Sequence, residues 1–220
     1  MSLMHAIRFA ATGDASVLEL VDVPVPVPSP TQALIRLEAI GVNFIDTYYR
    51  RGLYPAPLPS IPGQEGVGVV VAVGSEVTTC VVGDRVVFAS SFVSAYAEQV
   101  AIDGAQLVRV PDGVASDVAC AAMLQGMTAH YLAHGAFALR ATHTALVHAA
   151  AGGTGQLLVQ LAKRTGARVI GTVSSEAKAR IASALGCDLV IRYDSEDFVD
   201  GARAFTGGRG VDVVYDGVGA

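Results

Sequence analysis

The stretch at residues 145–155, ALVHAAAGGTG, constrains the fold of this chain more than any other segment. A short apolar strand leads into a glycine-rich turn, and the amphipathic segment Gln156–Thr165 follows it as a helix. Strand, glycine loop and helix form the start of a dinucleotide-binding βαβ unit, whose template is G-x-G-x-x-G. Residues 150–155 meet this template with Ala150 in place of the first glycine. The sequence therefore predicts a loop that binds the diphosphate of a dinucleotide.

Each part of this loop has a predicted role. Gly152 lets the backbone approach a pyrophosphate, Gly155 lets the helix pack closely on the strand, and the helix N-terminus attracts the anion. The predicted phosphate-binding residues are Ala151, Gly152, Gly153, Thr154 and Gly155. The P-loop of nucleoside triphosphatases is excluded, because it requires Lys and Ser or Thr directly after its last glycine, where this chain has Gln156 and Leu157.

The residues after the loop continue as alternating strands and helices. Strands are predicted at Ala167–Val173, Asp188–Ile191 and Val211–Tyr215, and a helix at Glu176–Leu185. Continuous β-branched runs between helices predict a parallel sheet that is buried on both faces. This context favours a dinucleotide loop over a ligand-free turn of small residues.

The tip of the second strand indicates which dinucleotide is bound. An NAD site usually has Asp or Glu there, to hold the ribose 2′-hydroxyl. This strand instead ends in Ser174 and Ser175, and Lys178 and Arg180 follow within one turn. Small hydroxyls and two cations suit a 2′-phosphate, so the sequence favours NADPH as the cofactor. Glu176 keeps NAD open, and the two cations are also compatible with an ordinary solvated helix face.

The composition limits the possible partners and the compartment. A net charge of −5 over 220 residues argues against nucleic acid or an anionic membrane surface as a partner. The uncharged segment Thr142–Ala162 contains the glycine loop and two histidines, so no membrane span is predicted. The cysteines, Cys80, Cys120 and Cys187, match no C-x-x-C spacing and indicate a reducing compartment. With no signal peptide visible in residues 1–11, we expect a cytoplasmic protein.

The first half of the chain shows an all-β pattern, with turn signals between short apolar segments. The predicted strands are Met4–Ala10, Val17–Val23, Gln32–Val42, Val67–Gly74, Asp84–Ala89, Ala95–Ala101 and Leu107–Val110. The first long helical pattern begins near Ala115–Leu124. We therefore expect two domains, residues 1–123 and 124–220, the first of β type and the second of α/β type.

Five blocks of sequence carry a family resemblance over the whole chain. They are GVNFIDTYYR at 41–50, GLYP at 52–55, PGQEGVG at 62–68, GDRV at 83–86 and the loop at 149–155. With these blocks in this order, the chain resembles the medium-chain dehydrogenase/reductase superfamily, and within it the zinc-free quinone oxidoreductases related to zeta-crystallin. The resemblance implies a GroES-like β-domain on the substrate side, followed by a Rossmann-type NADPH-binding domain.

The residues also predict that the chain binds no metal. A catalytic zinc takes three His, Cys or carboxylate ligands and keeps one position open. Zinc enzymes of the superfamily carry Cys and His where this chain has Asn43 and Gln64, which leaves only Glu65 as a ligand. His130 and His134 have helical i, i+4 spacing, but a tyrosine stands where the metalloprotease motif requires Glu, so we interpret them as ordinary helix residues.

Without zinc, hydrogen-bond donors must stabilise the charge that develops on the acceptor carbonyl. The candidate catalytic residues in the matched blocks are Asn43, Asp46, Tyr48, Tyr54 and Gln64. Asp46 is expected to orient one of the others, and for each tyrosine a packing role is equally open. No residue stands out as a proton-transfer group, because the hydride chemistry belongs to the nicotinamide.

The resemblance places further residues beside the cofactor. It implies that Asn43, Tyr54 and Thr128 lie next to NADPH. It also implies that Ser174, Lys178 and Tyr193 surround the adenosine phosphate end.

The end of the chain predicts an incomplete Rossmann sheet. From Thr144 onward the sequence contains four predicted strands, whereas the complete fold has six, in the order 3-2-1-4-5-6. The segment Gly217–Ala220 directly follows the fourth strand. We therefore expect a domain truncated after its fourth strand, which leaves an apolar edge. A homodimer is expected for a full-length relative.

Three functions remain open from the sequence. The first is an NADPH:quinone oxidoreductase that acts without zinc. The second is an NADPH-dependent enoyl or alkenal reductase of the same superfamily. For these two functions the partner is a small-molecule substrate, a quinone or an enone. The third is a non-catalytic, crystallin-like NADPH-binding protein.

Overall fold

The chain folds into two compact units. The computed structural model describes residues 2–91, 94–217 and 219, and the units are Met1–Leu124 and Gln125–Ala220. Helix α2 (Ser116–His130) contains the point where one unit ends and the next begins. Within the described residues, the helices are too short or too polar to cross a membrane.

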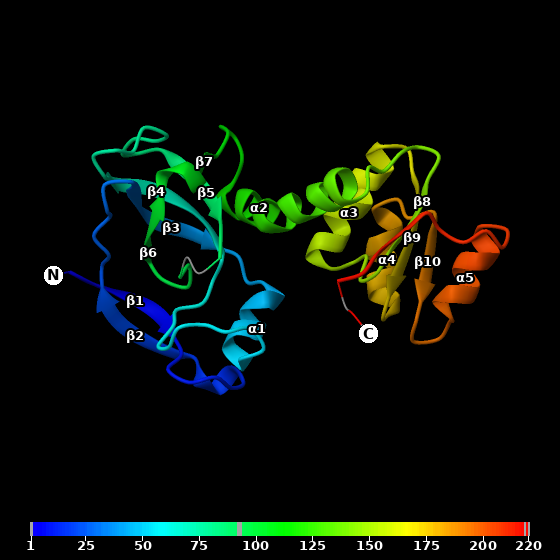
Figure 1. The fold of residues 1–220 in the computed structure, drawn as a ribbon, viewed down its shortest axis with the longest axis horizontal. Helices are drawn as coiled ribbons and strands as arrows, with labels where there is room; N and C mark the ends of the chain where they lie inside the picture. Colours follow the sequence, from blue (N-terminus) through cyan, green and yellow to red (C-terminus); the bar gives the residue numbers. More distant parts are fainter. Residues whose placement is uncertain (1, 92–93, 218, 220) are drawn as a thin grey trace. The chain divides into compact units, whose positions relative to one another are not determined.

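The first unit is built on a five-stranded antiparallel sheet in the order β6-β3-β4-β5-β7 (Figure 1). Its strands are β3 (Gln32–Ile40), β4 (Glu65–Val73), β5 (Arg85–Ala89), β6 (Gln99–Asp103) and β7 (Val108–Arg109). A separate antiparallel pair joins β1 (Leu3–Arg8) to β2 (Glu19–Pro24). The predicted β character of this unit is confirmed, although the unit also contains a helix and β6 begins later than expected. Ile35, Val70 and Phe88 are fully buried at the centre of the core.

Helix α1 (Phe44–Arg51) is an element that the sequence did not predict. It begins after Asn43, whose backbone N–H donates to Asp46 Oδ2 at 2.9 Å, as in a capping box. It ends at Gly52, where φ is +78°, a left-handed conformation that favours glycine. A helix of two turns shows too little periodicity to be recognised from its apolar residues. Its N-terminus holds two of the predicted catalytic residues.

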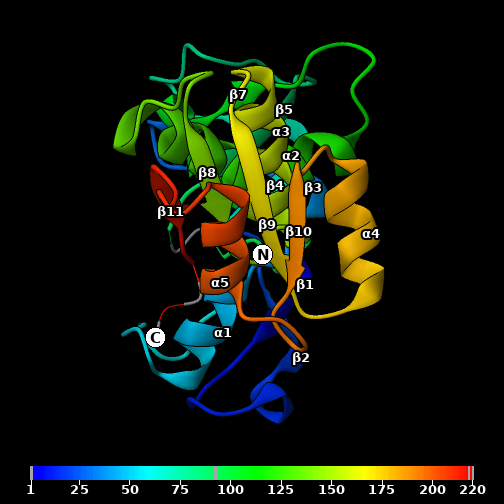
Figure 2. The ribbon, with the colours of Figure 1, turned by 90° about the vertical axis from the view of Figure 1, so that its right-hand side faces the viewer.

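The second unit is a four-stranded parallel sheet in the order β10-β9-β8-β11 (Figure 2). The strands are β8 (Thr144–Val147), β9 (Arg168–Val173), β10 (Leu189–Arg192) and β11 (Val213–Tyr215). In chain order this is 3-2-1-4, which matches the first four strands of a Rossmann sheet. The predicted parallel sheet is therefore confirmed. Residues 218 and 220, part of the chain end discussed above, lie outside the described residues.

Helices cover both faces of the parallel sheet, as its apolar strands require. The helices are α3 (Gly153–Arg164), α4 (Glu176–Ala184) and α5 (Phe198–Phe205), and α3 begins earlier than predicted. Figure 1 shows α3 and α4 on one face and α5 on the other. On the first face Val147 of β8 packs with Leu158 of α3, and on the second Leu146 and Ile170 pack with Ala202 of α5.

Asp212 ties the start of β11 to β8. The guanidinium of Arg209 donates to both of its carboxylate oxygens, at 2.8 and 3.2 Å, and the backbone N–H of Thr144 donates to Oδ2 at 2.7 Å. These contacts, the Arg209 hydrogen bonds first, lower the pKa of Asp212 to about 2. The ionised carboxylate therefore stabilises the fold above the unfolded pKa of about 3.9. This contribution is lost as the pH falls from about 4 through about 2.

We expect Asp212→Asn to lower the free energy of unfolding at pH 7 and to weaken its dependence on pH in the acid range, because the variant has no carboxylate there to titrate. Urea unfolding of both proteins between about pH 2 and pH 7 measures this. Parallel stability curves for the two proteins across this range would contradict the assignment.

Candidate active site

A buried hydrogen-bond chain fixes the side chain of Asn43. Asn43 Nδ2 donates to Glu65 Oε1 at 2.8 Å, and the backbone N–H of Leu124 donates to Glu65 Oε2, also at 2.8 Å. Glu65 is only 1% exposed, so its two oxygens are committed to these partners. A Cβ added at Gly41 would lie 2.0 Å from Glu65 Oε1, so the carboxylate fills space that a glycine leaves. Glu65, weighed from sequence only as a zinc ligand, is a positioning residue for Asn43.

Asp46 holds the start of α1 through a second set of hydrogen bonds. Its Oδ2 accepts the backbone N–H of Asn43 and, at 3.0 Å, the phenol of Tyr96. Burial raises the pKa of Asp46, and these hydrogen bonds oppose that rise. Burial and the neighbouring carboxylate also raise the pKa of Tyr96, so Tyr96 remains a hydrogen-bond donor. Tyr96 was not predicted, because no motif relates it to residues 41–50.

Gln64 lies inside the first unit, next to Glu65 in sequence. Its side chain is buried, and its Nε2 has no hydrogen-bond partner among the described residues. Together with Asp46 and Tyr49 it lines a cavity of about 20 Å³. The structure thus brings Gln64 close to Asp46.

The two predicted tyrosines belong to a partly exposed aromatic cluster, which we define as Phe44, Tyr48, Tyr49 and Tyr54. The rings of Tyr48 and Tyr54 meet edge to face with their centroids 5.4 Å apart, and Phe44 meets Tyr48 at the same distance. Phe44 is 75% exposed and Tyr54 46% exposed. This cluster offers a planar ligand both apolar ring surface and phenol hydroxyls.

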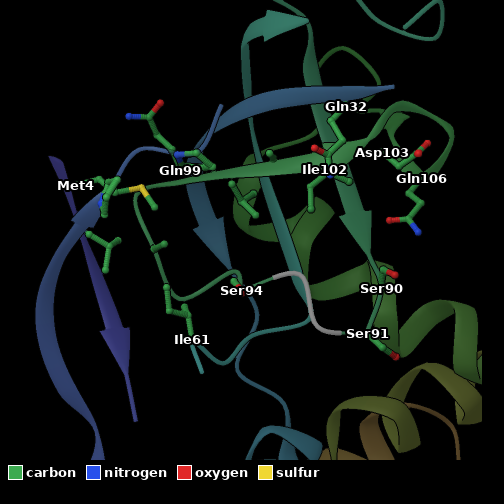
Figure 3. Close-up of a pocket in the computed structure, with 16 residues that line it drawn as sticks. Met4, Gln32, Ile61, Ser90, Ser91, Ser94, Gln99, Ile102, Asp103 and Gln106 are labelled. Carbon is green, nitrogen blue, oxygen red and sulfur yellow. The ribbon is translucent and has the colours of Figure 1, made fainter. Parts of the chain in front are cut away.

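A more open pocket, of about 530 Å³, is lined by residues of β1, β2 and β6. Figure 3 shows Gln32, Asp103 and Gln106 on one side of it and Met4 and Ile61 on the other. None of the predicted catalytic residues is among the described residues that line it. The volume of this pocket therefore does not identify it as the predicted catalytic site.

In the second unit the glycine loop leads from β8 into α3. A Cβ added at Gly155 would lie 2.3 Å from the carbonyl oxygen of Ala149 and 2.9 Å from Cα of Ala150, so a larger residue does not fit. Gly152 is the N-cap of α3, and no described side chain caps the helix. The N–H groups of the first turn are therefore left for an anion, and the loop fits a phosphate group.

Three predicted cofactor residues lie near one another in the same unit: Ser174 and Tyr193 directly follow β9 and β10, and Lys178 is in the first turn of α4. Lys178 Nζ donates to Ser174 Oγ at 3.0 Å, just beyond the tip of β9. The backbone N–H of Tyr193, which follows β10, donates to the carbonyl of Val173 at 3.1 Å. A cation, a hydroxyl and a half-exposed tyrosine thus lie where a ribose phosphate binds in Rossmann sheets. Thr128 is exposed on α2.

Two family models match the chain. Residues 29–141 match the alcohol dehydrogenase GroES-like domain, and residues 153–220 match the zinc-binding dehydrogenase domain. Over 214 residues the chain is 48% identical to a quinone oxidoreductase of Pseudomonas aeruginosa. This alignment covers 97% of this chain and 66% of that relative. The chain belongs to the quinone oxidoreductase family. This family is part of the medium-chain dehydrogenase/reductase superfamily that the sequence blocks indicated, so that prediction is confirmed.

Solved structures of quinone oxidoreductases and their relatives share both folds. A mycobacterial protein complexed with NADPH matches with a TM-score of 0.95 and 48% identity, covering 99% of this chain and 68% of that one. The Escherichia coli quinone oxidoreductase complexed with NADPH matches with a TM-score of 0.93 and 39% identity, covering 98% and 67%. The chain thus spans about two thirds of the length of these relatives. The predicted fold class, a GroES-like domain and a Rossmann-type sheet, is confirmed.

The second family model is named for zinc, and the described residues of this chain do not fit that metal. Among the described residues, no three His, Cys, Asp or Glu side chains lie close enough to share a metal ion. Burial, and after it the charge of Glu65, raises the pKa of the Cys120 thiol to about 11, so the thiol is protonated at neutral pH. The ring centroids of His130 and His134 lie 4.5 Å apart, but two histidines are fewer than the three protein ligands that a catalytic zinc takes.

Proposed function

We propose that this chain carries the cofactor-binding and acceptor-binding residues of an NADPH-dependent quinone reductase that works without zinc. The observation that carries the proposal is the glycine loop. The backbone packs tightly at Gly155, and no described side chain caps the N–H groups at the start of α3. Relatives that are complexed with NADPH and share this fold support the choice of cofactor. The name of the similar Pseudomonas aeruginosa protein supports the choice of acceptor.

Each end of the cofactor has proposed partners. The first-turn N–H groups of α3 would hold the diphosphate over the loop residues Ala151, Gly152, Gly153, Thr154 and Gly155. Lys178 and Ser174, joined at 3.0 Å, would take the 2′-phosphate together with Tyr193. Asn43, Tyr54 and Thr128 remain the proposed neighbours of the rest of NADPH. When bound, the nicotinamide supplies the hydride.

On the acceptor side, the chain supplies oriented hydrogen bonds instead of a metal. Glu65 fixes the amide of Asn43, which is 8% exposed, so this group needs no reorganisation when charge develops on a carbonyl oxygen. The hydroxyls of Tyr48 and Tyr54 would donate hydrogen bonds, while the aromatic cluster packs against a planar quinone ring. Asp46, which is buried, would hold the start of α1 in place, and the buried Gln64 would pack beside it rather than touch the acceptor.

The test is NADPH oxidation with 1,4-benzoquinone compared with an enone. We expect faster turnover with the quinone, no loss of rate after treatment with a chelator, and weaker activity with NADH. A faster rate with the enone would favour an enoyl or alkenal reductase. Tight binding of NADPH without turnover of either acceptor would favour the non-catalytic, crystallin-like function.

We further propose a small-molecule acceptor as the partner, a cytoplasmic location and, for a full-length relative, a homodimer. The resemblance to the family supports the dimer, and cysteines without pairing motifs support a reducing compartment. The net charge of −5 supports the absence of nucleic-acid and membrane partners. Sedimentation of a purified full-length relative tests the dimer, and a monomer at micromolar concentration would contradict it.

A further inference from the structure

Glu176 is the acidic residue because of which the sequence does not exclude NAD as the cofactor. It is the first residue of α4, close after the tip of β9. In the structure its carboxylate lies between two guanidinium groups. Arg180 Nε lies 3.4 Å from Oε1, and Arg192 Nη1 lies 3.5 Å from Oε2. The charge of Glu176 is therefore shared by cations from two different elements.

Arg192 is the more firmly held of these two cations. Its side chain is 34% exposed, compared with 79% for Arg180. Asp194 accepts hydrogen bonds from Arg192 Nε at 3.2 Å and from Nη2 at 2.9 Å, which fixes the plane of the guanidinium. Nη1, on the other branch, then faces Glu176. Asp194 thus orients Arg192 toward this carboxylate.

Lys178 differs from both arginines in its partner. Its Nζ donates to the hydroxyl of Ser174, and among the described residues no ion pair involves this lysine. Within this group of side chains, two cations compensate Glu176 while a third faces a neutral group. The charge of Lys178 is therefore the one that remains for an anionic ligand.

We propose that Arg192 is a specificity-determining residue for the cofactor. By keeping Glu176 paired, it prevents this carboxylate from accepting the ribose 2′-hydroxyl of NADH and from repelling the 2′-phosphate of NADPH. Arg192 acts through Glu176 and is therefore a positioning residue. The inference rests on the proposed function, because it concerns the same nucleotide site. Exposed ion pairs of this kind add little stability, so cofactor selectivity is the property to measure.

The test is titration of the wild type and Arg192→Gln with NADPH and with NADH at one fixed ionic strength. We expect the dissociation constant for NADPH to rise roughly fivefold to tenfold, because an uncompensated carboxylate then lies near the phosphate. The dissociation constant for NADH should stay the same or fall. In the double variant Arg192→Gln/Glu176→Gln the repelling charge is gone, so the NADPH:NADH ratio should return to within about twofold of wild type.

Matched variants separate this mechanism from others. Arg164→Gln makes the same charge change at the far end of α3 and should leave the ratio unchanged. Glu176→Gln alone should not weaken NADPH binding, and this variant keeps the test valid even if Arg192→Gln is unstable. A double variant that stays as weak as Arg192→Gln would mean that Arg192 binds the phosphate itself, which overturns the proposal. An unchanged ratio in Arg192→Gln also overturns it. If the wild type binds neither nucleotide, the proposed function fails as well.

Discussion

Replacing Gly155 by valine is expected to abolish dinucleotide binding. A Cβ at this position would lie 2.3 Å from the carbonyl oxygen of Ala149 and 2.9 Å from Cα of Ala150. Both are backbone atoms, so no change of rotamer relieves the overlap, and the loop must move away from the start of α3. The N–H groups that we assign to the diphosphate then no longer point toward the same position. We expect NADPH binding to weaken by at least about 100-fold, with a loss of roughly 1–3 kcal/mol in stability from overpacking.

Titration with NADPH followed by fluorescence measures this effect, and thermal unfolding shows whether the variant is folded. Gly217→Ala is the matched control, because a Cβ there would meet no atom within 4 Å and its φ is not left-handed. That variant should bind like the wild type. Binding by a folded Gly155→Val protein within tenfold of wild type would contradict the assigned role of the loop.

The nucleotide unit was predictable because its signals are local. The continuous apolar strands between helices indicate a parallel sheet, and the loop at 150–155 marks where it begins. Short connections with a fixed handedness then leave few possible strand orders. The first unit offers no comparable rule, because its antiparallel strands pair over long sequence distances, as β3 does with β6. Helix α1 escaped prediction because a helix of only two turns shows too little apolar periodicity to be recognised.

The sequence suggested residue types for the candidate site but not the hydrogen bonds between them. Asn43 stood out in the sequence, whereas Glu65, which orients it, and Tyr96, which holds Asp46, come from other elements. No spacing rule connects residues that meet only through tertiary packing. The same holds for Arg192, because its distance from Glu176 depends on how β10 lies beside β9.

Glu65→Gln is expected to lower kcat strongly while the free energy of unfolding falls only slightly. Glu65 receives two donors, Asn43 Nδ2 and the N–H of Leu124, and an amide offers only one acceptor oxygen. The backbone N–H cannot turn over, so the new amide should keep its oxygen toward Leu124 and force the Asn43 amide to flip. Asn43 would then present the wrong group to the acceptor. We expect a loss of about 1 kcal/mol in stability and a roughly 10- to 100-fold fall in kcat.

Urea unfolding and steady-state kinetics with 1,4-benzoquinone measure the two effects separately, and the exposed Glu76→Gln serves as the control with the same chemical change. The double variant Asn43→Asp/Glu65→Gln separates positioning from simple structural support. In it, the new amide donates to a carboxylate at position 43 and still accepts from Leu124, so stability should recover toward wild type. Turnover should not recover, because a carboxylate has no hydrogen to donate to the developing oxyanion. Full turnover in either variant would show that the orientation of the Asn43 amide does not control the reaction.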